Sequence, residues 1–321
     1  MTKRIWVLTD DRAGNNAQAL GVAESTGFAV ETKRVYYTKC AVLPNFLRGA
    51  TTLGVARETL NEIKPPYPDF VVAAGRRAAP LARYVKKKSA GKTKIVQLMF
   101  PGKAGLDDFD LVVLPAHDGF TQERANVVRY IGAPNRVTDE KLESEKARWA
   151  DVFEKIPSPR VALIVGGKTK NRPFTAAQAQ ELARLTNEFT NSLGGASVLA
   201  TTSRRTGGEQ TRILQESLQN CAYFYKYGDA GENPYFALLA YADYIVATGD
   251  SMSMCSEACA ARAPVYIYAP DGFCAPKHAR LHQELYQAGY AAPLDEAGKT
   301  ALKPHEPLRI AALIAERMKN D

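Results

Sequence analysis

Short apolar runs alternate along the whole chain with longer segments of mixed polarity. Most of the runs are continuously apolar, which is typical of strands covered on both faces, and the segments between them have the length of helices. The predicted strands are Arg4–Thr9, Ala29–Val35, Phe70–Ala74, Ile95–Leu98, Leu111–Leu114 and Val127–Ile131 in the first half, and Val161–Val165, Ser197–Thr201, Tyr223–Tyr225, Tyr244–Ala247 and Val265–Tyr268 in the second. The pattern therefore predicts parallel α/β layers in both halves.

Helices are predicted where apolar positions recur with helical spacing between start and stop signals. The clearest are Thr175–Ser192 (with Thr175 as N-cap), Gly208–Leu218, Ser251–Ala261, Pro276–Ala288 and Pro307–Lys319. Two prolines in Ile156-Pro157-Ser158-Pro159 interrupt a charged helical stretch, and we place the linker between two domains there.

We expect two doubly wound, Rossmann-like domains that face a cleft. The N-terminal domain would span residues 1–156 and the C-terminal domain residues 157–306, while the last helix, 307–321, would pack back on the N-terminal domain. In such sheets ligands bind at the carboxyl ends of the strands, so the loops after the predicted strands are where functional side chains are expected.

The composition favours a globular cytoplasmic protein over a membrane-spanning or secreted one. The chain has 321 residues, of which 45% are hydrophobic and 24% charged, as in ordinary globular proteins. Its apolar runs are far shorter than the roughly 20 residues of a membrane span, and the N-terminus lacks the pattern of a signal peptide. The five cysteines are scattered without a Cys-x-x-Cys pair, which indicates reduced thiols in a cytoplasmic protein.

The positive charge is concentrated in the first half. The whole chain carries +8, but residues 1–155 have 25 Lys+Arg against 18 Asp+Glu, and residues 156–321 have 17 against 16. A basic first half favours an anionic partner such as a phospholipid surface or a phosphorylated substrate, with a solvated surface as the alternative. Nucleic acid is not expected, because the basic residues are not interleaved with aromatic stacking groups.

Two phosphate-binding signatures are absent. Gly166-Gly167-Lys168-Thr169 resembles the end of a P-loop, but the first glycine of that motif is replaced by Ala162. The first predicted strand is followed by Asp10–Asn15 and not by a Gly-x-Gly-x-x-Gly turn, so a dinucleotide fold of that kind is excluded there.

Two other spacings favour structural roles. Tyr84 and Lys88 have the spacing of a short-chain dehydrogenase pair, but they lie in a lysine run that predicts a solvated helix face. His278 and His282 have helical metal-ligand spacing without an acidic or thiol partner nearby in sequence, so a surface helix is the simpler interpretation.

In the first half, polar residues follow three predicted strands. Candidates for proton transfer are Asp10, Asp11, His117 and Asp118, and candidates for binding the phosphate of an acceptor are Arg12, Gly14, Asn15, Arg76 and Arg77. A carboxylate or imidazole at a strand end can accept a proton, and a helix start with arginines can hold an anion. Capping of the helix by Asp10 and Asp11 is the alternative.

In the second half, the loops predict a nucleotide-type ligand. The most informative stretch is Thr248–Ala258, in which a strand leads through Gly-Asp-Ser into a helix whose first turn can bind a diphosphate. A carboxylate six residues after Ser251, Glu257, can accept from ribose hydroxyls. The candidate donor-binding residues are Gly166, Gly167, Lys168, Thr201, Arg204, Asn233, Asp250, Ser251, Ser253 and Glu257.

Several of these motifs, in the same order, resemble the "elongated mitochondria" fission family. They are residues 10–21, 74–82, 115–118, 166–169, 233–235 and 248–258. The family comprises plant proteins and bacterial relatives that are often described as predicted nucleoside-diphosphate-sugar epimerases. It is similar in turn to GT-B glycosyltransferases, especially the one that adds N-acetylglucosamine to the peptidoglycan lipid precursor.

The resemblance implies a GT-B fold and a nucleoside-diphosphate sugar donor in the cleft. The diphosphate and ribose would lie on the second-half residues, and the basic N-terminal domain would meet a lipid-linked or other anionic acceptor. No cofactor or metal is implied, since arginine and lysine side chains can neutralise the leaving diphosphate. Where such transferases carry a histidine base, this chain has Asp10-Asp11-Arg12, so the base is Asp10, Asp11 or His117.

We therefore expect a hexosyltransferase-like enzyme in the cytoplasm, associated peripherally with the inner face of the membrane through its basic domain. Two alternatives stay open at this point. Non-hydrolysing nucleotide-sugar 2-epimerases share the GT-B fold, and a non-catalytic scaffold related to organelle fission proteins would need no chemistry at all.

Overall fold

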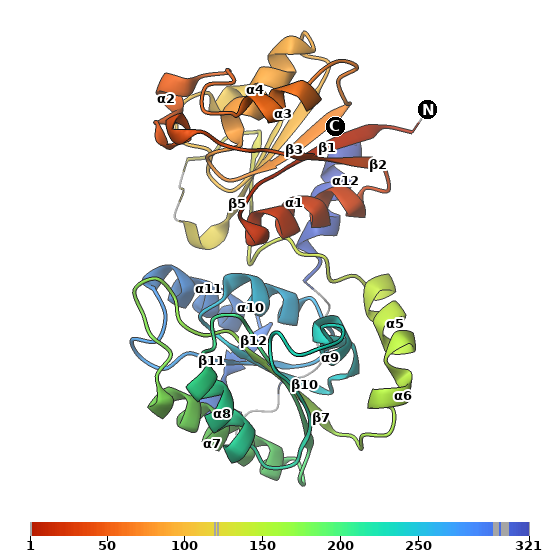
Figure 1. The fold of residues 1–321 in the computed structure, drawn as a ribbon, viewed down its shortest axis with the longest axis vertical. Helices are drawn as coiled ribbons and strands as arrows, with labels where there is room; N and C mark the ends of the chain where they lie inside the picture. The colour runs from red at the N-terminus through yellow and green to blue at the C-terminus, as the bar shows by residue number, and fades with distance from the viewer. Residues whose placement is uncertain (1, 119, 121, 298–301, 303–307, 321) are drawn as a thin grey trace. The chain divides into compact units, whose positions relative to one another are not determined.

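The computed structural model describes residues 2–118, 120, 122–297, 302 and 308–320 (Figure 1). The chain forms two compact units, one made of Met1–Arg136 with Arg309–Asp321 and the other of Val137–Leu308. None of the helices in the described part of the chain is long and apolar enough to cross a bilayer.

The first unit contains a parallel six-stranded sheet of order β2-β1-β3-β4-β5-β6. Its strands are β1 (Arg4–Thr9), β2 (Ala29–Arg34), β3 (Phe70–Ala74), β4 (Lys94–Leu98), β5 (Leu111–Pro115) and β6 (Val127–Tyr130). Its helices are α1 (Ala13–Ser25), η1 (Lys39–Val42), α2 (Asn45–Arg48), α3 (Arg57–Glu62), α4 (Ala79–Lys88), η2 (Leu106–Asp108), η3 (Ala116–Asp118) and α12 (Ile310–Asn320). The inner strands are buried as their apolar runs predict, whereas β2 is an exposed edge strand.

Helix α4 carries Tyr84 and Lys88 in its last two turns. The helix buries an apolar face against β3 and β4, and it ends in three lysines. The ammonium of Lys88 lies over the ring of Tyr84 at 5.7 Å from its centroid, a cation–π contact on the helix surface.

The end of the chain completes the first unit. Helix α12 packs on α1 and buries Ile310, Ile314 and Met318. The last helix thus lies with the N-terminal unit, as the sequence predicts.

The second unit contains a second parallel sheet, of order β12-β11-β10-β7-β8-β9. Its strands are β7 (Arg160–Val165), β8 (Ser197–Thr202), β9 (Cys221–Tyr225), β10 (Tyr244–Thr248), β11 (Val265–Tyr268) and β12 (Ala291–Pro293). Its helices are α5 (Asp139–Arg148), α6 (Ala150–Phe153), α7 (Ala176–Ser192), α8 (Gly208–Ser217), α9 (Tyr235–Tyr241), α10 (Met252–Cys259), α11 (Pro276–Gln287) and η4 (Leu294–Glu296).

The division between the units differs from the predicted boundary at residue 156. Helices α5 and α6 belong to the second unit, where α5 packs on α9. Phe153 is fully buried there, with its ring 4.9 Å from that of Tyr223 and 5.4 Å from that of Tyr241. These aromatic contacts outweigh the proline signal, which marks only the start of β7.

This division sharpens the charge asymmetry. The first unit has 24 Lys+Arg against 14 Asp+Glu, or +10, and the second has 18 against 20, or −2. The excess of basic residues therefore belongs entirely to the first unit.

Candidate functional site

Each sheet has a topological switch point beside its first strand. In the first unit β1 lies between β2 and β3, and in the second β7 lies between β8 and β10. Loops on either side of such a point diverge and leave room for a ligand at the carboxyl ends of the strands. A ligand site is therefore expected at the loops after β7 and β10, and at those after β1 and β3.

At the second switch point Asp250 joins the loops after β7 and β10. Thr248 Oγ1 donates to the Asp250 carboxylate at 2.7 Å, and the backbone N–H of Gly167 donates to it at 2.9 Å. The N–H of Gly166 donates to Thr248 Oγ1 at 2.7 Å. These bonds fix the position of the two loops relative to each other.

Asp250 also pairs with a guanidinium. Arg205 Nη2 lies 2.8 Å from the Asp250 carboxylate, whose side chain is only 1% exposed. Both carboxylate oxygens are thus bonded within the protein, and Asp250 holds the loops after β7, β8 and β10 together. This role differs from the direct contact with a donor that the sequence suggests.

The two glycines after β7 are required by this packing. A Cβ on Gly166 would lie 2.3 Å from the Asp250 carboxylate oxygens, and one on Gly167 would lie 2.1 Å from the carbonyl oxygen of Arg205. Gly167 also has a φ of +149°. The close approach that the sequence assigns to a ligand is here an approach between two loops of the protein.

The loop after β8 supplies a cation that the sequence analysis did not select. Arg204 is exposed, whereas Arg205 reaches Asp250 and also donates to the carbonyl oxygen of Lys168 at 3.2 Å. Thr201 is buried. Nothing in the sequence distinguishes two adjacent arginines, because only the turn that follows β8 decides which one points to the switch point.

Helix α10 begins at this point. Ser251 is its N-cap, with Oγ accepting from the N–H of Met254 at 3.4 Å, so this hydroxyl has a capping role. Ser253 lies in the first turn and is half-buried. The first-turn N–H groups have no intrahelical acceptor and carry partial positive charge. The exposed Lys168 adds a second cation on the neighbouring loop.

Further along α10, Glu257 forms a pair with Tyr235. Tyr235 Oη donates to Glu257 Oε2 at 2.6 Å. Burial raises the pKa of Glu257 to about 7, and the tyrosine hydrogen bond opposes that rise. Asn233 is exposed and its Oδ1 accepts from the N–H of Tyr235 at 3.0 Å, so it starts the helix that carries the tyrosine. The Asn-Pro-Tyr motif thus acts through Tyr235, which the sequence analysis did not choose.

The two histidines of α11 differ in burial, since His278 is half-buried and His282 is buried. Burial lowers the pKa of His278, and the nearby Asp250 charge opposes that shift. His282 is buried, with Nε2 4.0 Å from Cys255 Sγ. Helix α11 has one exposed and one buried face, so it is the surface helix that the sequence suggests, with His282 on its buried side. Within the described part of the chain, no group of three or more His, Cys, Asp or Glu residues is placed to hold a metal ion.

At the first switch point Asp10 has a structural role similar to that of Asp250. Its carboxylate accepts from Arg77 Nη2 and from the N–H of Arg12, both at 2.8 Å, and it is buried. Asp11 is exposed and also pairs with Arg77, whose hydrogen bond lowers the pKa of Asp11. Of the two carboxylates, Asp11 is the one that solvent reaches.

Two buried hydrogen-bond donors without a partner among the described residues lie near Asp10 and Asp11. Arg77 lies over the ring of Tyr37, 4.7 Å from its centroid, and both Tyr37 Oη and Arg77 Nε are buried with no hydrogen-bond partner among the described residues. Helix α1 has no side-chain cap, and Arg12 at its N-cap is exposed. Buried donors beside an uncapped helix start are suited to an anion.

The other predicted binding residues of the first unit lie after β1 and after β3. Gly14 is exposed in the first turn of α1, and Asn15 Nδ2 donates to the carbonyl of Ala74 at 3.4 Å. Arg76 is exposed and donates to the carbonyls of Leu43 and Val42 at 2.9 and 3.3 Å. Arg76 therefore ties the loop to the segment before α2.

His117 and Asp118 lie in η3, after β5. Strands β3 and β4 separate β5 from β1, a distance of roughly 14 Å at the usual strand spacing. The side chain of His117 is outside the described residues, and Asp118 is half-buried with a bonding partner. The fold does not bring this pair to the Asp10–Arg77 cluster.

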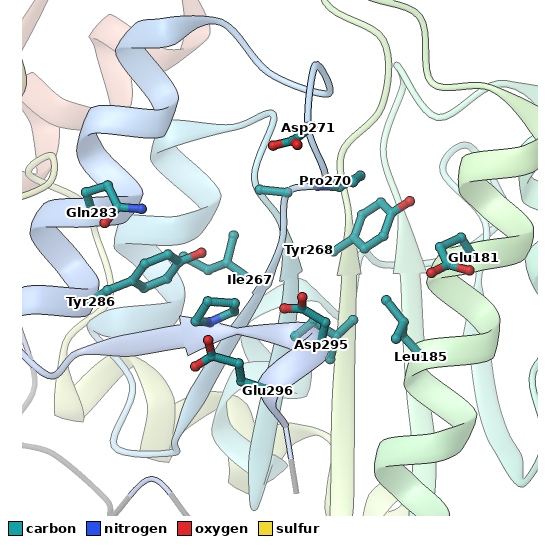
Figure 2. A pocket seen from close by; sticks show the side chains of 13 residues that line it. Glu181, Leu185, Ile267, Tyr268, Pro270, Asp271, Gln283, Tyr286, Asp295 and Glu296 are labelled. Carbon is teal, nitrogen blue, oxygen red and sulfur yellow. The ribbon is translucent and has the colours of Figure 1, made fainter. Parts of the chain in front are cut away.

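A separate cavity in the second unit lies apart from the predicted residues. It has a volume of about 450 Å³ and opens between α7, β11 and α11. Figure 2 shows Glu181, Asp271, Asp295 and Glu296 around it, with the rings of two tyrosines. Four carboxylates disfavour an anionic ligand such as a diphosphate, so this cavity is not the donor site.

The sequence matches one described family. The model of Mitochondrial fission ELM1 matches residues 13–321. The uncharacterized protein RP120 of Rickettsia prowazekii (strain Madrid E) is 30% identical over 98% of this chain and 97% of its own length. The mitochondrial fission protein ELM1 of Arabidopsis thaliana is 28% identical over 74% of this chain and 59% of its own length.

The fold matches solved two-domain proteins. UDP-GlcNAc 2-epimerase from Methanocaldococcus jannaschii gives a TM-score of 0.53 at 12% identity over 99% of this chain and 100% of that chain. The Neisseria meningitidis epimerase bound to UDP-GlcNAc gives 0.52 at 11% over 99% and 100%. Arabidopsis thaliana UGT89C1 complexed with UDP-L-rhamnose gives 0.53 at 10% over 99% and 94%. The two parallel sheets thus have the GT-B architecture that the motifs predict.

Proposed function

The chain belongs to the mitochondrial fission ELM1 family, and from this premise we propose that it is a glycosyltransferase whose nucleoside-diphosphate sugar binds the second unit. The observation that carries the proposal is the Glu257–Tyr235 pair, in which Glu257 of α10, the helix after β10, accepts from Tyr235 at the start of α9. Nucleotide sugars bound to proteins of the same fold support this class of ligand.

In this proposal the diphosphate lies at the start of α10. The first-turn N–H groups, Arg205 and Lys168 would supply the positive charge that holds it and that stabilises the leaving nucleotide. Glu257 is five residues further along the helix than Met252, about 7.5 Å at the usual rise, and its carboxylate would accept from the ribose hydroxyls. Ser253 would bind beside the diphosphate.

The first unit would bind the acceptor. An anionic group of the acceptor would take the unpartnered donors of Tyr37 and Arg77, together with Arg12 and the first-turn N–H groups of α1. We assign the acceptor proton to Asp11, because Asp10 is buried with its oxygens already bonded. His117, the alternative base that the sequence suggests, follows β5, three strands from β1, and the fold therefore favours Asp11 over it.

Nucleotide titration tests the donor site. We expect UDP and UDP-sugars to bind in saturation-transfer NMR and calorimetry, and Glu257→Gln or Tyr235→Phe to weaken binding by about 10- to 100-fold, the effect of losing one charge-assisted hydrogen bond. Glu181→Gln and Tyr268→Phe, in the acidic cavity, are the matched controls and should bind as the parent does.

The products separate the proposed reaction from its alternatives. Release of free UDP together with a new glycoside is expected from a transferase, and loss of both in Asp11→Asn would support the assigned base. An epimerised nucleotide sugar would replace the proposal by a 2-epimerase. Unchanged nucleotide binding in both Glu257→Gln and Tyr235→Phe would reject the donor site itself.

A further inference from the structure

Helix α2, which Figure 1 labels in the first unit, has the reverse of the usual burial pattern. Its polar residues Asn45 and Arg48 point inward, and the Arg48 side chain is 0% exposed. Its apolar residues Phe46 and Leu47 are 70% and 58% exposed. A short amphipathic helix of a soluble unit ordinarily buries the opposite face.

Neighbouring residues extend this exposed surface. Val42, at the end of η1, is 74% exposed, and Leu53 is exposed in the following turn. We call Val42, Phe46, Leu47 and Leu53 the apolar knob. Of the nine large apolar side chains that are exposed in the described part of the chain, these four and Tyr36 lie within residues 36–53. Such a concentration marks an interaction surface.

The apolar knob is held in place by buried polar groups. Arg48 Nε donates to the carbonyl of Leu53 at 3.0 Å, and its Nη1 donates to the carbonyl of Arg77 at 3.3 Å. Asn45 Nδ2 donates to the carbonyls of Arg76 and Pro101 at 2.9 and 2.6 Å. A buried guanidinium without a carboxylate partner is costly, so the exposed conformation is specified and is not a frayed loop.

Basic residues predominate in the segment that carries the apolar knob; Arg34, Lys39 and Arg57 are exposed there, whereas Arg48 is buried and Lys33 pairs with Glu31. Residues 32–57 contain no Asp or Glu and five basic residues, namely Lys33, Arg34, Lys39, Arg48 and Arg57. Lys39 is exposed within η1, which ends at Val42, and Arg76 donates to the carbonyl of Val42. Arg34 lies over the ring of Tyr36 at 5.6 Å.

We propose that the apolar knob inserts into the surface of an anionic lipid bilayer, with the surrounding basic residues on its headgroups. Apolar side chains that project between cations match the layered chemistry of that surface, and tyrosine suits its boundary. A second copy of the chain is disfavoured, because it would bring two units of +10 together. The proposal does not depend on glycosyl transfer.

Vesicle flotation tests it with the full chain. The protein should float with phosphatidylcholine vesicles that contain about 30 mol% phosphatidylglycerol, and much less with phosphatidylcholine alone. The double variant Phe46→Ser/Leu47→Ser should reduce the partition coefficient by about tenfold or more. Lys39→Ser should reduce it by about threefold at low salt and less at high salt.

Matched controls lie in the second unit. Val152→Ser removes an exposed apolar side chain and Lys155→Ser an exposed lysine, and neither should change flotation. The proposal is overturned if the parent does not float with anionic vesicles, or if Phe46→Ser/Leu47→Ser floats as the parent does. A concentration-dependent dimer that this double variant abolishes would overturn it in favour of a second copy, and a retained protein partner in place of lipid would also overturn it.

Discussion

At the scale of single residues, two carboxylates seven positions apart have opposite environments. Asp250 is surrounded by donors from Gly167, Thr248 and Arg205. Glu257 has one tyrosine hydroxyl and little other compensation for its burial, which raises its pKa to about 7. The difference assigns Asp250 to structure and leaves Glu257 able to bind a ligand.

The raised pKa of Glu257 has a consequence for stability. Its ordinary value is 4.5, so between that pH and about 7 the folded protein holds a proton that the unfolded chain has released. The free energy of unfolding therefore falls as pH rises through this window. Glu257→Gln should remove this pH dependence. The free energy of unfolding of the variant, measured relative to the parent, should therefore be about 1–3 kcal/mol higher at pH 8 than at pH 5.

Urea unfolding at several pH values measures this difference. Glu154→Gln, which changes an exposed carboxylate of the same unit, serves as control and should follow the parent at every pH. A gap between parent and Glu257→Gln that does not change from pH 5 to pH 8 would contradict the prediction.

At the scale of elements, strands were easier to predict than the loops between them. The bounds of β1, β3 and β11 agree with their apolar runs, and the capping box of Thr175 and Gln178 starts α7 where expected. Strand β12 was missed because it has only three residues and ends in proline. The choice of Arg205 over Arg204 depends on a turn whose course no local pattern specifies.

The loop after β7 allows a test of element packing. Gly167→Ala places a methyl group against the carbonyl of Arg205, 2.1 Å from its oxygen, and should destabilise the protein by about 2–4 kcal/mol and weaken nucleotide binding. Gly228→Ala shares a positive φ but meets no atom within 4 Å, so about 1 kcal/mol is expected.

Chemical denaturation of both variants isolates the contact from the backbone strain. Equal losses of stability in Gly167→Ala and Gly228→Ala would mean that the two loops do not pack as closely as described.

At the scale of the whole molecule, the chain crosses between its units twice. Residues from Val137 onward join the second unit through aromatic contacts of α6, and residues from Arg309 onward return to the first unit. The stability of α1 and β1 therefore depends on side chains near the far end of the chain.

Ile314 tests that dependence. It is fully buried where α12 packs on α1, so Ile314→Ala should destabilise the first unit by about 2–4 kcal/mol. In a hydrogen-exchange measurement, the amide protons of α1 and β1 should lose protection, and those of β7 and β10 should keep it. The neighbouring Leu313 is exposed, and Leu313→Ala should leave exchange unchanged. An equal loss of amide protection in both units would refute the assignment of α12 to the first unit.

The sequence alone determined the α/β class, most of the strands and the family, because local apolar patterns and short motifs carry that information. It also placed Asp11 in the loop after the first strand and Glu257 in the helix that follows Gly249-Asp250-Ser251. Only the tertiary structure decided that Asp250 and Asp10 are saturated by internal donors, that Arg205 pairs with Asp250 and that Tyr235 pairs with Glu257. Likewise it alone turned Phe46 outward and Arg48 inward. These outcomes depend on partners distant in sequence, and burial and hydrogen bonding are properties of that assembled environment.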